Sequence, residues 1–175
     1  LEERPDFVIV EFSVNDESTE HYKETYEGLV RKILGAAWNP AVLLVHNVFY
    51  HNGANAQVMH GAIGRHYDLP SVSMQSSIYP EVVAGRIENR AITPDDLHPN
   101  DEGHALVASV ITYFLEQVRS GKQTGDHAGF APGAKLPAPL TKNAYEDSLR
   151  IRNAAAPDMA GLPQPLMEGF VPDEA

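Results

Sequence analysis

The fold is decided by the stretch Asp6-Phe7-Val8-Ile9-Val10-Glu11-Phe12, a short apolar run rich in β-branched residues. A parallel strand that is buried on both faces has this pattern, so we predict a central parallel strand here. The run Ala41-Val42-Leu43-Leu44-Val45 repeats the pattern. A third, shorter strand is predicted near Ser71 to Met74.

Helices are predicted between and after these strands. Between the first two, apolar residues recur at helical spacing, with Ser18 and Gly35 as start and stop signals: Tyr22, Tyr26, Leu29, Val30, Ile33 and Leu34. Val58, Met59, Ala62 and Ile63 indicate a second helix. The clearest helix follows Pro99, where an apolar stripe runs from Leu106 to Val118.

The element order β-α-β-α-β-α predicts the fold class. Strands that alternate with helices form a parallel sheet covered on both faces, which is an α/β fold with a three-layer α/β/α sandwich. Three strands are few for such a sheet. We therefore expect the N-terminal strands to be missing from this chain, which would leave one edge of the sheet without its neighbour.

The composition changes near residue 120, which divides the chain into 1–120, the C-terminal portion of a domain, and 121–175, a Pro/Gly-rich tail or linker. Seven of the thirteen prolines lie between Pro132 and Pro172. Within the tail, Thr141 to Asn153 could form one short helix that docks through Tyr145 and Leu149. The alternative is a linker that leads to a further C-terminal module.

Charge and composition exclude several classes of partner. The net charge is −11, from 24 acidic and 13 basic residues, and no basic cluster could follow a phosphate backbone, so we expect no nucleic-acid partner. No apolar run approaches the roughly 20 residues of a membrane helix, so we expect no membrane partner. The absence of cysteine fits reducing and oxidising compartments alike, and we favour the bacterial cytoplasm over secretion.

Two polar motifs carry candidate chemistry. Ser13-Val14-Asn15-Asp16 directly follows the first strand, at the edge where open α/β sheets build their sites, although Asn-Asp there is also common turn chemistry. The second motif contains Asp95-Asp96-Leu97-His98-Pro99. A carboxylate three residues before a histidine can accept the Nδ1 proton and leave Nε2 free as a base, whereas the alternative is a turn beside a surface histidine.

Together the two motifs resemble those of the SGNH hydrolases, also called GDSL-like lipases and acylhydrolases, and the chain looks most like bacterial carbohydrate esterases of that family. The resemblance covers about Pro5 to Val118 and matches the family's Gly-x-Asn-Asp and Asp-x-x-His blocks, the latter continuing to Gly103-His104. It implies that Asn15 donates its amide to the oxyanion, His98 is the base and Asp95 orients His98.

The family's Gly-Asp-Ser block and its isolated glycine are absent from this chain, and Ser13 stands where the family has glycine. The resemblance therefore implies that the nucleophilic serine is supplied by a segment upstream of Leu1. We expect none of Ser13, Ser76 and Ser77 to replace it, because none lies on a Gly-flanked turn between a strand and a helix.

Other polar side chains follow the second and third predicted strands, and Asn47, Tyr50 and Gln75 are the candidates for substrate binding. His46 and His51 are interpreted as loop and pocket residues, since the chain has no histidine pattern with metal-ligand spacing. We expect no metal and no cofactor.

The resemblance implies a serine esterase that cleaves short-chain, acetyl-type esters, with esters on carbohydrate among its candidate substrates. The alternative is a catalytically inactive domain of the same fold that binds glycan or another subunit. The retention of Asn15, Asp95 and His98 together favours the enzyme.

Overall fold

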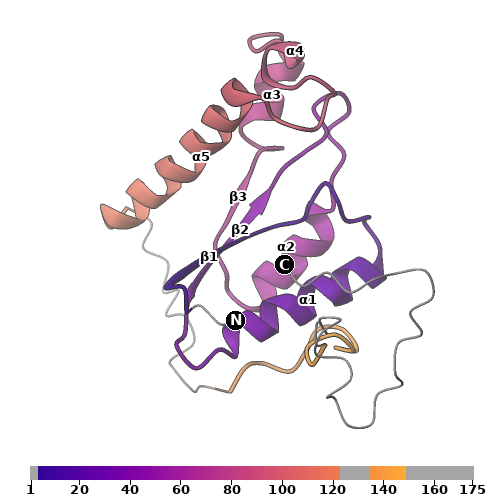
Figure 1. Cartoon of the computed structure of the whole chain (residues 1–175), viewed down its shortest axis with the longest axis vertical. Helices are drawn as coiled ribbons and strands as arrows, with labels where there is room; N and C mark the ends of the chain where they lie inside the picture. Colours follow the sequence, from indigo (N-terminus) through magenta and orange to yellow (C-terminus); the bar gives the residue numbers. More distant parts are fainter. Residues whose placement is uncertain (1–3, 123–134, 149–175) are drawn as a thin grey trace, which may run out of the picture.

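The computed structural model describes residues 4–122 and 135–148. Its strands and helices, in chain order, are β1 (Phe7–Glu11), α1 (Glu20–Leu34), β2 (Ala41–His46), α2 (Gln57–His66), β3 (Ser71–Ser73), α3 (Ile78–Val83), α4 (Asn89–Ile92) and α5 (Asp101–Arg119). Figure 1 shows how they are arranged. The three strands and three longest helices lie where the sequence predicts them.

The strands form one parallel sheet in the order β1-β2-β3. In the register of the sheet, Phe7 pairs with Ala41 and Leu44 with Ser71. Within residues 4–122 and 135–148, β1 pairs with β2 alone and lies at the edge of the sheet, so its prediction as a central strand is not confirmed here. Consequently Phe7 is 40% and Ile9 47% exposed, although their strand has the sequence of a buried one.

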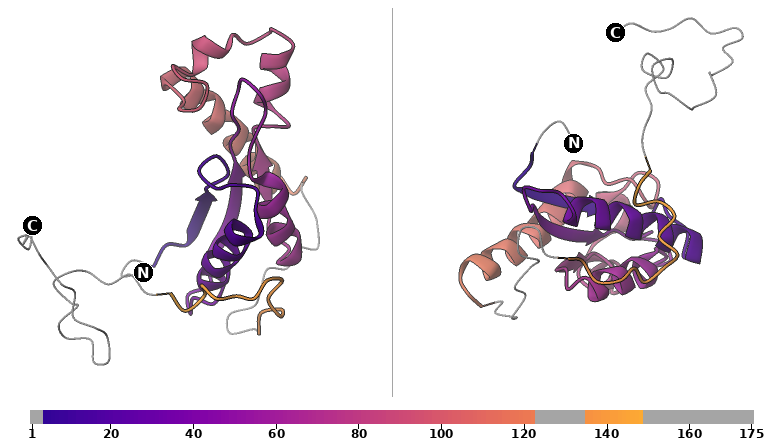
Figure 2. Two further views of the ribbon diagram at one scale, coloured as in Figure 1. Left: turned by 90° about the vertical axis from the view of Figure 1, so that its right-hand side faces the viewer. Right: turned by 90° about the horizontal axis from the view of Figure 1, so that it is seen from below.

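Helices cover both faces of the sheet, which confirms the predicted α/β fold with a parallel sheet. α1 and α2 lie on one face, where Val10, Val42 and Leu44 of the strands form a core with side chains of both helices. On the other face, Leu43, Val45 and Val72 pack under α5. The views of Figure 2, turned from that of Figure 1, show the sheet between these helices.

The ends of α1 differ in part from the prediction. Thr19, and not Ser18, is the N-cap, since its side chain accepts a hydrogen bond from the Tyr22 amide. Gly35 does end the helix, and its amide donates to the Arg31 carbonyl. The short helices α3 and α4 were not predicted, because four to six residues are too few to display a helical period.

The tail segment 135–148 lies against α1 and is irregular, so the short helix expected from Thr141 does not begin within it. Its orange trace runs beside α1 in Figure 1. Tyr145 does contact α1, as its backbone and Cβ close over Gly28, whereas Leu149 to Asn153 lie outside the described residues.

The carboxylate of Glu27 anchors this segment. It accepts hydrogen bonds from the Leu140 amide at 2.6 Å, the Thr141 amide at 2.7 Å and the Tyr67 hydroxyl at 2.6 Å. Burial alone would raise the pKa of Glu27, but the hydrogen bonds outweigh it and lower this pKa. One turn later Arg31 donates to Glu146 and to the Pro137 carbonyl.

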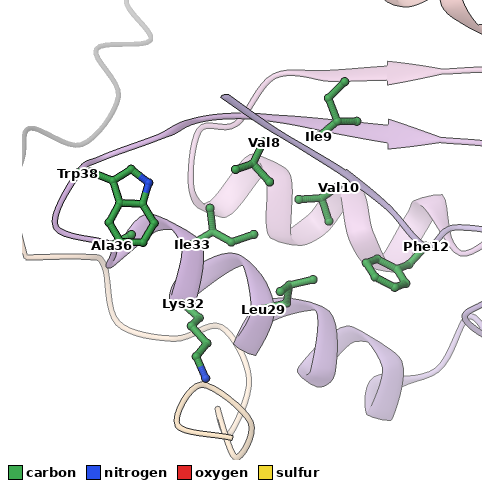
Figure 3. Close-up of a pocket in the computed structure, with 9 residues that line it drawn as sticks. All are labelled: Val8, Ile9, Val10, Phe12, Leu29, Lys32, Ile33, Ala36 and Trp38. Atoms are coloured by element: carbon green, nitrogen blue, oxygen red, sulfur yellow. The ribbon is translucent and has the colours of Figure 1, made fainter. Parts of the chain in front are cut away.

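An open apolar groove of about 390 Å³ lies between β1 and α1. Val8 lines it from β1 and Phe12 from the position just after β1. Leu29 and Ile33 line it from α1, and Trp38 lies at one end (Figure 3). The groove and the unpaired side of β1 together form the exposed edge of the sheet. No helix within residues 4–122 and 135–148 is long and apolar enough to cross a membrane.

Candidate active site

His98 and Asp95 form the predicted pair in the loop between α4 and α5. The Asp95 carboxylate lies with Oδ2 2.6 Å from His98 Nδ1, while its Oδ1 accepts the backbone amides of His98 at 2.8 Å and Leu97 at 3.1 Å. These bonds, with the one to the imidazole largest, lower the pKa of Asp95 to about 2. A carboxylate at Nδ1 stabilises the tautomer that carries the proton there, so Nε2 is left unprotonated as a base.

The imidazole of His98 faces solvent, with 73% of the side chain exposed. The ring is therefore open to a reaction partner on its Nε2 side.

The neighbouring Asp96 has a different, structural environment. Its backbone adopts the left-handed conformation at φ 72°, and its carboxylate accepts from Asn89 at 2.6 Å and from Arg90 at 3.0 Å. The pairing of His98 with Asp95 and not with Asp96 follows from this geometry, because the Asp96 side chain is turned to α4.

The start of α5 packs closely against Ile92, at the beginning of the loop that carries Asp95 and His98. The Asn100 side chain caps α5 by accepting a hydrogen bond from the Gly103 amide at 3.0 Å. The backbone amide of Asn100 donates to the Ile92 carbonyl at 3.0 Å. A Cβ on Gly103 would lie 2.3 Å from the Ile92 carbonyl oxygen. The glycine of the second motif is thus required by the contact between α5 and the segment that leads into Asp95 and His98.

The loop after β1 is held at Ser13. The Ser13 side chain is fully buried, with Oγ 2.7 Å from a Glu11 carboxylate oxygen and 3.0 Å from the Asn47 carbonyl, and its own carbonyl accepts the Ala56 amide at 2.7 Å. Ser13 therefore fits at the position of the expected glycine, and its hydroxyl is enclosed. Asn15, two residues later, is exposed.

The loop is held a second time at Asp16. Its Oδ2 lies 3.0 Å from Nε2 of His60, a fully buried residue of α2. The ring of Tyr26 stacks on that imidazole with a centroid distance of 3.7 Å and an angle of 4° between the planes. His46, at the end of β2, is the next ring along, 6.2 Å from His60 between centroids. The sequence pattern gave no sign of the contact between Asp16 and His60, which are 44 positions apart.

The loop that follows β2 joins the two motifs. At its start the Asn47 carbonyl lies at Ser13 Oγ, and further on the Tyr50 amide donates to the Asp96 carbonyl at 2.9 Å. Since parallel strands end at the same edge of a sheet, the loops with Asn15 and His98 are both on the carboxyl edge of this one.

The three residues predicted to bind substrate have different environments. Tyr50 is only 4% exposed and belongs to the core under α5, so its ring is not on an open pocket wall, and burial raises its pKa to about 12. Asn47 is partly buried and uses its backbone to hold the Ser13 loop. The Gln75 amide donates to the Gly53 carbonyl at 2.7 Å. His46 was interpreted as a pocket residue, but it is 1% exposed and belongs to the interior.

The other two serines weighed as nucleophiles, Ser76 and Ser77, follow β3. Ser77 Oγ donates to the Ser73 carbonyl at 2.7 Å, and Ser76 is exposed after β3. Among the described residues, no group of three or more histidine, aspartate or glutamate side chains is arranged to hold a metal ion.

Comparison with known proteins gives close matches among solved structures. One is a two-domain esterase active on acetylated mannans, 71% identical to this chain with a TM-score of 0.77 over 86% of the chain. The same kind of esterase co-crystallised with mannopentaose is 69% identical, with a TM-score of 0.76 over 86% of the chain. The chain spans 38–39% of the length of these proteins. No protein-family model and no curated protein matches the chain.

Proposed function

We propose that the chain is part of an acetyl esterase of the SGNH type that acts on acetylated carbohydrate, with mannans as the first substrate class to test. The observation that carries the proposal is the Asp95–His98 pair, in which the carboxylate contacts Nδ1 at 2.6 Å and the imidazole side chain is 73% exposed. The similarity at 69–71% identity to esterases active on acetylated mannans supports the choice of substrate.

In the proposed mechanism, His98 Nε2 takes the proton of a serine hydroxyl as its oxygen attacks the ester carbonyl. Asp95 stays ionised throughout and stabilises the imidazolium. The amide of Asn15 donates to the oxyanion of the tetrahedral intermediate. His98 then gives its proton to the leaving sugar hydroxyl, and water repeats the sequence to release acetate.

We further propose that the nucleophilic serine belongs to a segment upstream of Leu1. Ser13 is fully buried, and Ser77 is bonded to its own turn, so neither is poised to meet His98. The unpaired edge of β1 and the apolar groove beside it offer a place for an added strand. A further C-terminal module after the tail remains part of this proposal.

The first experiment substitutes His98 in the full-length protein. His98→Ala should abolish nearly all release of acetate from acetylated mannan and from p-nitrophenyl acetate, because the serine then has no base. Since the side chain is 73% exposed, the circular dichroism spectrum should remain native. Full activity of a folded His98→Ala protein would reject the assigned role and favour a domain that only binds glycan.

A second experiment tests the origin of the serine. Residues 1–175 alone should not hydrolyse p-nitrophenyl acetate faster than free imidazole does, and a fluorophosphonate should label the full-length protein outside this range. Labelling of a serine within residues 1–175 would contradict the upstream assignment while leaving the roles of Asp95 and His98 open to the first experiment.

A further inference from the structure

Asn15 lies between two fixed points of its loop. On one side, Ser13 is fully buried and held by Glu11, Asn47 and Ala56. On the other side, Asp16 is held by the buried His60 at 3.0 Å. Among the described residues, the side-chain amide of Asn15 itself has no hydrogen bond to the protein. The loop is thus fixed on both sides of a residue whose donor group is free.

We infer that His60 is a positioning residue that holds the Asn15 amide in place for the oxyanion, acting through Asp16. This inference rests on the proposed function, since it assigns His60 a role only if Asn15 is the oxyanion donor. An oxyanion donor contributes most when it is held in place before the reaction, because no reorganisation is then needed in the transition state.

The hydrogen-bond chemistry fixes the direction of the contact. An ionised Asp16 can only accept, so the neutral imidazole must carry its proton on Nε2 and donate it to Asp16. The other nitrogen, Nδ1, is then an acceptor, and it is buried without a partner among the described residues. Desolvation by burial, which lowers the pKa of His60 to about 4, agrees with a neutral ring near pH 7.

The ring cannot turn away from Asp16. Tyr26 stacks on it with nearly parallel planes, and both rings are buried, at 2% exposure for Tyr26 and 0% for His60. α2 brings the same restraint to Ser13, since the Ala56 amide at the start of that helix donates to the Ser13 carbonyl. α2 therefore holds the loop both at Ser13 and at Asp16, so the position of the Asn15 backbone relative to the end of β1 is fixed.

The test variant is His60→Phe in the full-length esterase. Phenylalanine keeps an aromatic ring against Tyr26 but cannot donate to Asp16. We expect kcat on p-nitrophenyl acetate to fall by about tenfold to hundredfold with little change in KM, since a donor displaced by about 1 Å loses transition-state stabilisation on this scale. Asp16→Ala removes the acceptor at a side chain that is 15% exposed and keeps both rings of the His60–Tyr26 stack, and it should cause the same loss of kcat.

The decisive measurement is the same substitution in an Asn15→Ala background. If His60 acts through Asn15, His60→Phe should change kcat by no more than about twofold there, because the donor that it positions is already gone. A general structural effect would instead lower kcat equally in both backgrounds, which would overturn the inference.

Two further variants complete the set. Asp16→Asn keeps an oxygen that can accept from His60 Nε2, so it should retain nearly full kcat where Asp16→Ala does not. His46→Leu replaces the neighbouring buried histidine, which has no contact with Asp16, and should leave kcat unchanged. If Asn15→Ala alone left kcat unchanged, the oxyanion role in the proposed function would fail. If Asn15→Ala lowered kcat but His60→Phe and Asp16→Ala were both fully active, the proposed function would stand and this inference alone would fail.

Discussion

His46 makes the stability of the domain sensitive to acid, and this can be measured. The imidazole is 1% exposed, and neither of its nitrogens has a hydrogen-bond partner among the described residues. Burial, together with the nearby His60, lowers the pKa of His46 from 6.5 to about 4. The folded protein therefore binds this proton less readily than the unfolded chain does.

The sign and size of the effect follow from this difference in pKa. As the pH falls below 6.5 the unfolded state gains a proton that the folded state does not accept until about pH 4, so stability is lost across this interval. Between about pH 7 and about pH 4.5 the loss from His46 alone should be about 2 kcal/mol.

The assay is urea unfolding of the full-length protein at these two pH values, with His46→Leu beside the wild type. Leucine has no titratable group, so the variant should lose about 2 kcal/mol less than the wild type does on acidification. Val72→Ala is the control, because a cavity in the core should lower stability equally at both pH values. Equal acid losses for His46→Leu and wild type would refute the reasoning.

Three further predictions concern the site and the tail. Asp95→Asn should severely reduce kcat in the full-length esterase whereas Asp96→Asn should be mild, since only Asp95 contacts His98, and equal damage would contradict the pairing. Gly103→Ala should cost about 1–3 kcal/mol of stability in thermal unfolding, because its Cβ meets the Ile92 carbonyl, and a neutral result would reject that contact. Glu27→Gln should cost a similar 1–3 kcal/mol and speed proteolysis within residues 135–148, because an amide cannot accept all the donors there.

The strands and long helices could be predicted because their signals are local. A continuous apolar run such as Ala41 to Val45 has few alternatives to a buried strand, and α5 has a stripe long enough to show its period. The N-cap of α1 could not be predicted to the residue, since Ser18 and Thr19 are both suitable. The hydrogen bond that the Thr19 side chain accepts from the Tyr22 amide identifies Thr19.

The missed features depend on contacts between distant residues. Glu27 has the sequence appearance of a solvated helical residue, yet it is fully buried by a segment more than 110 positions away. His46 and Tyr50 belong to a polar stretch that starts at the end of β2, which favoured a pocket, but β2 itself places His46 in the interior and the loop that follows places Tyr50 there. The Asp95–His98 pair could be predicted because its members are only three positions apart, whereas the hydrogen bond between His60 and Asp16, 44 positions apart, could not.

The anchoring of residues 140 and 141 on Glu27 also sets an order of events during synthesis. The bonds join positions 113 and 114 residues apart, which at roughly 5–20 residues per second means that the donors leave the ribosome about 6–23 s after the carboxylate that they satisfy. During that interval the Glu27 carboxylate lacks these two donors, and α1 is not yet covered on the side where residues 135–148 lie. Residues 135–148 are thus the last part of the described chain to cover α1. A chaperone that recognises the uncovered helix would have to bind within this interval.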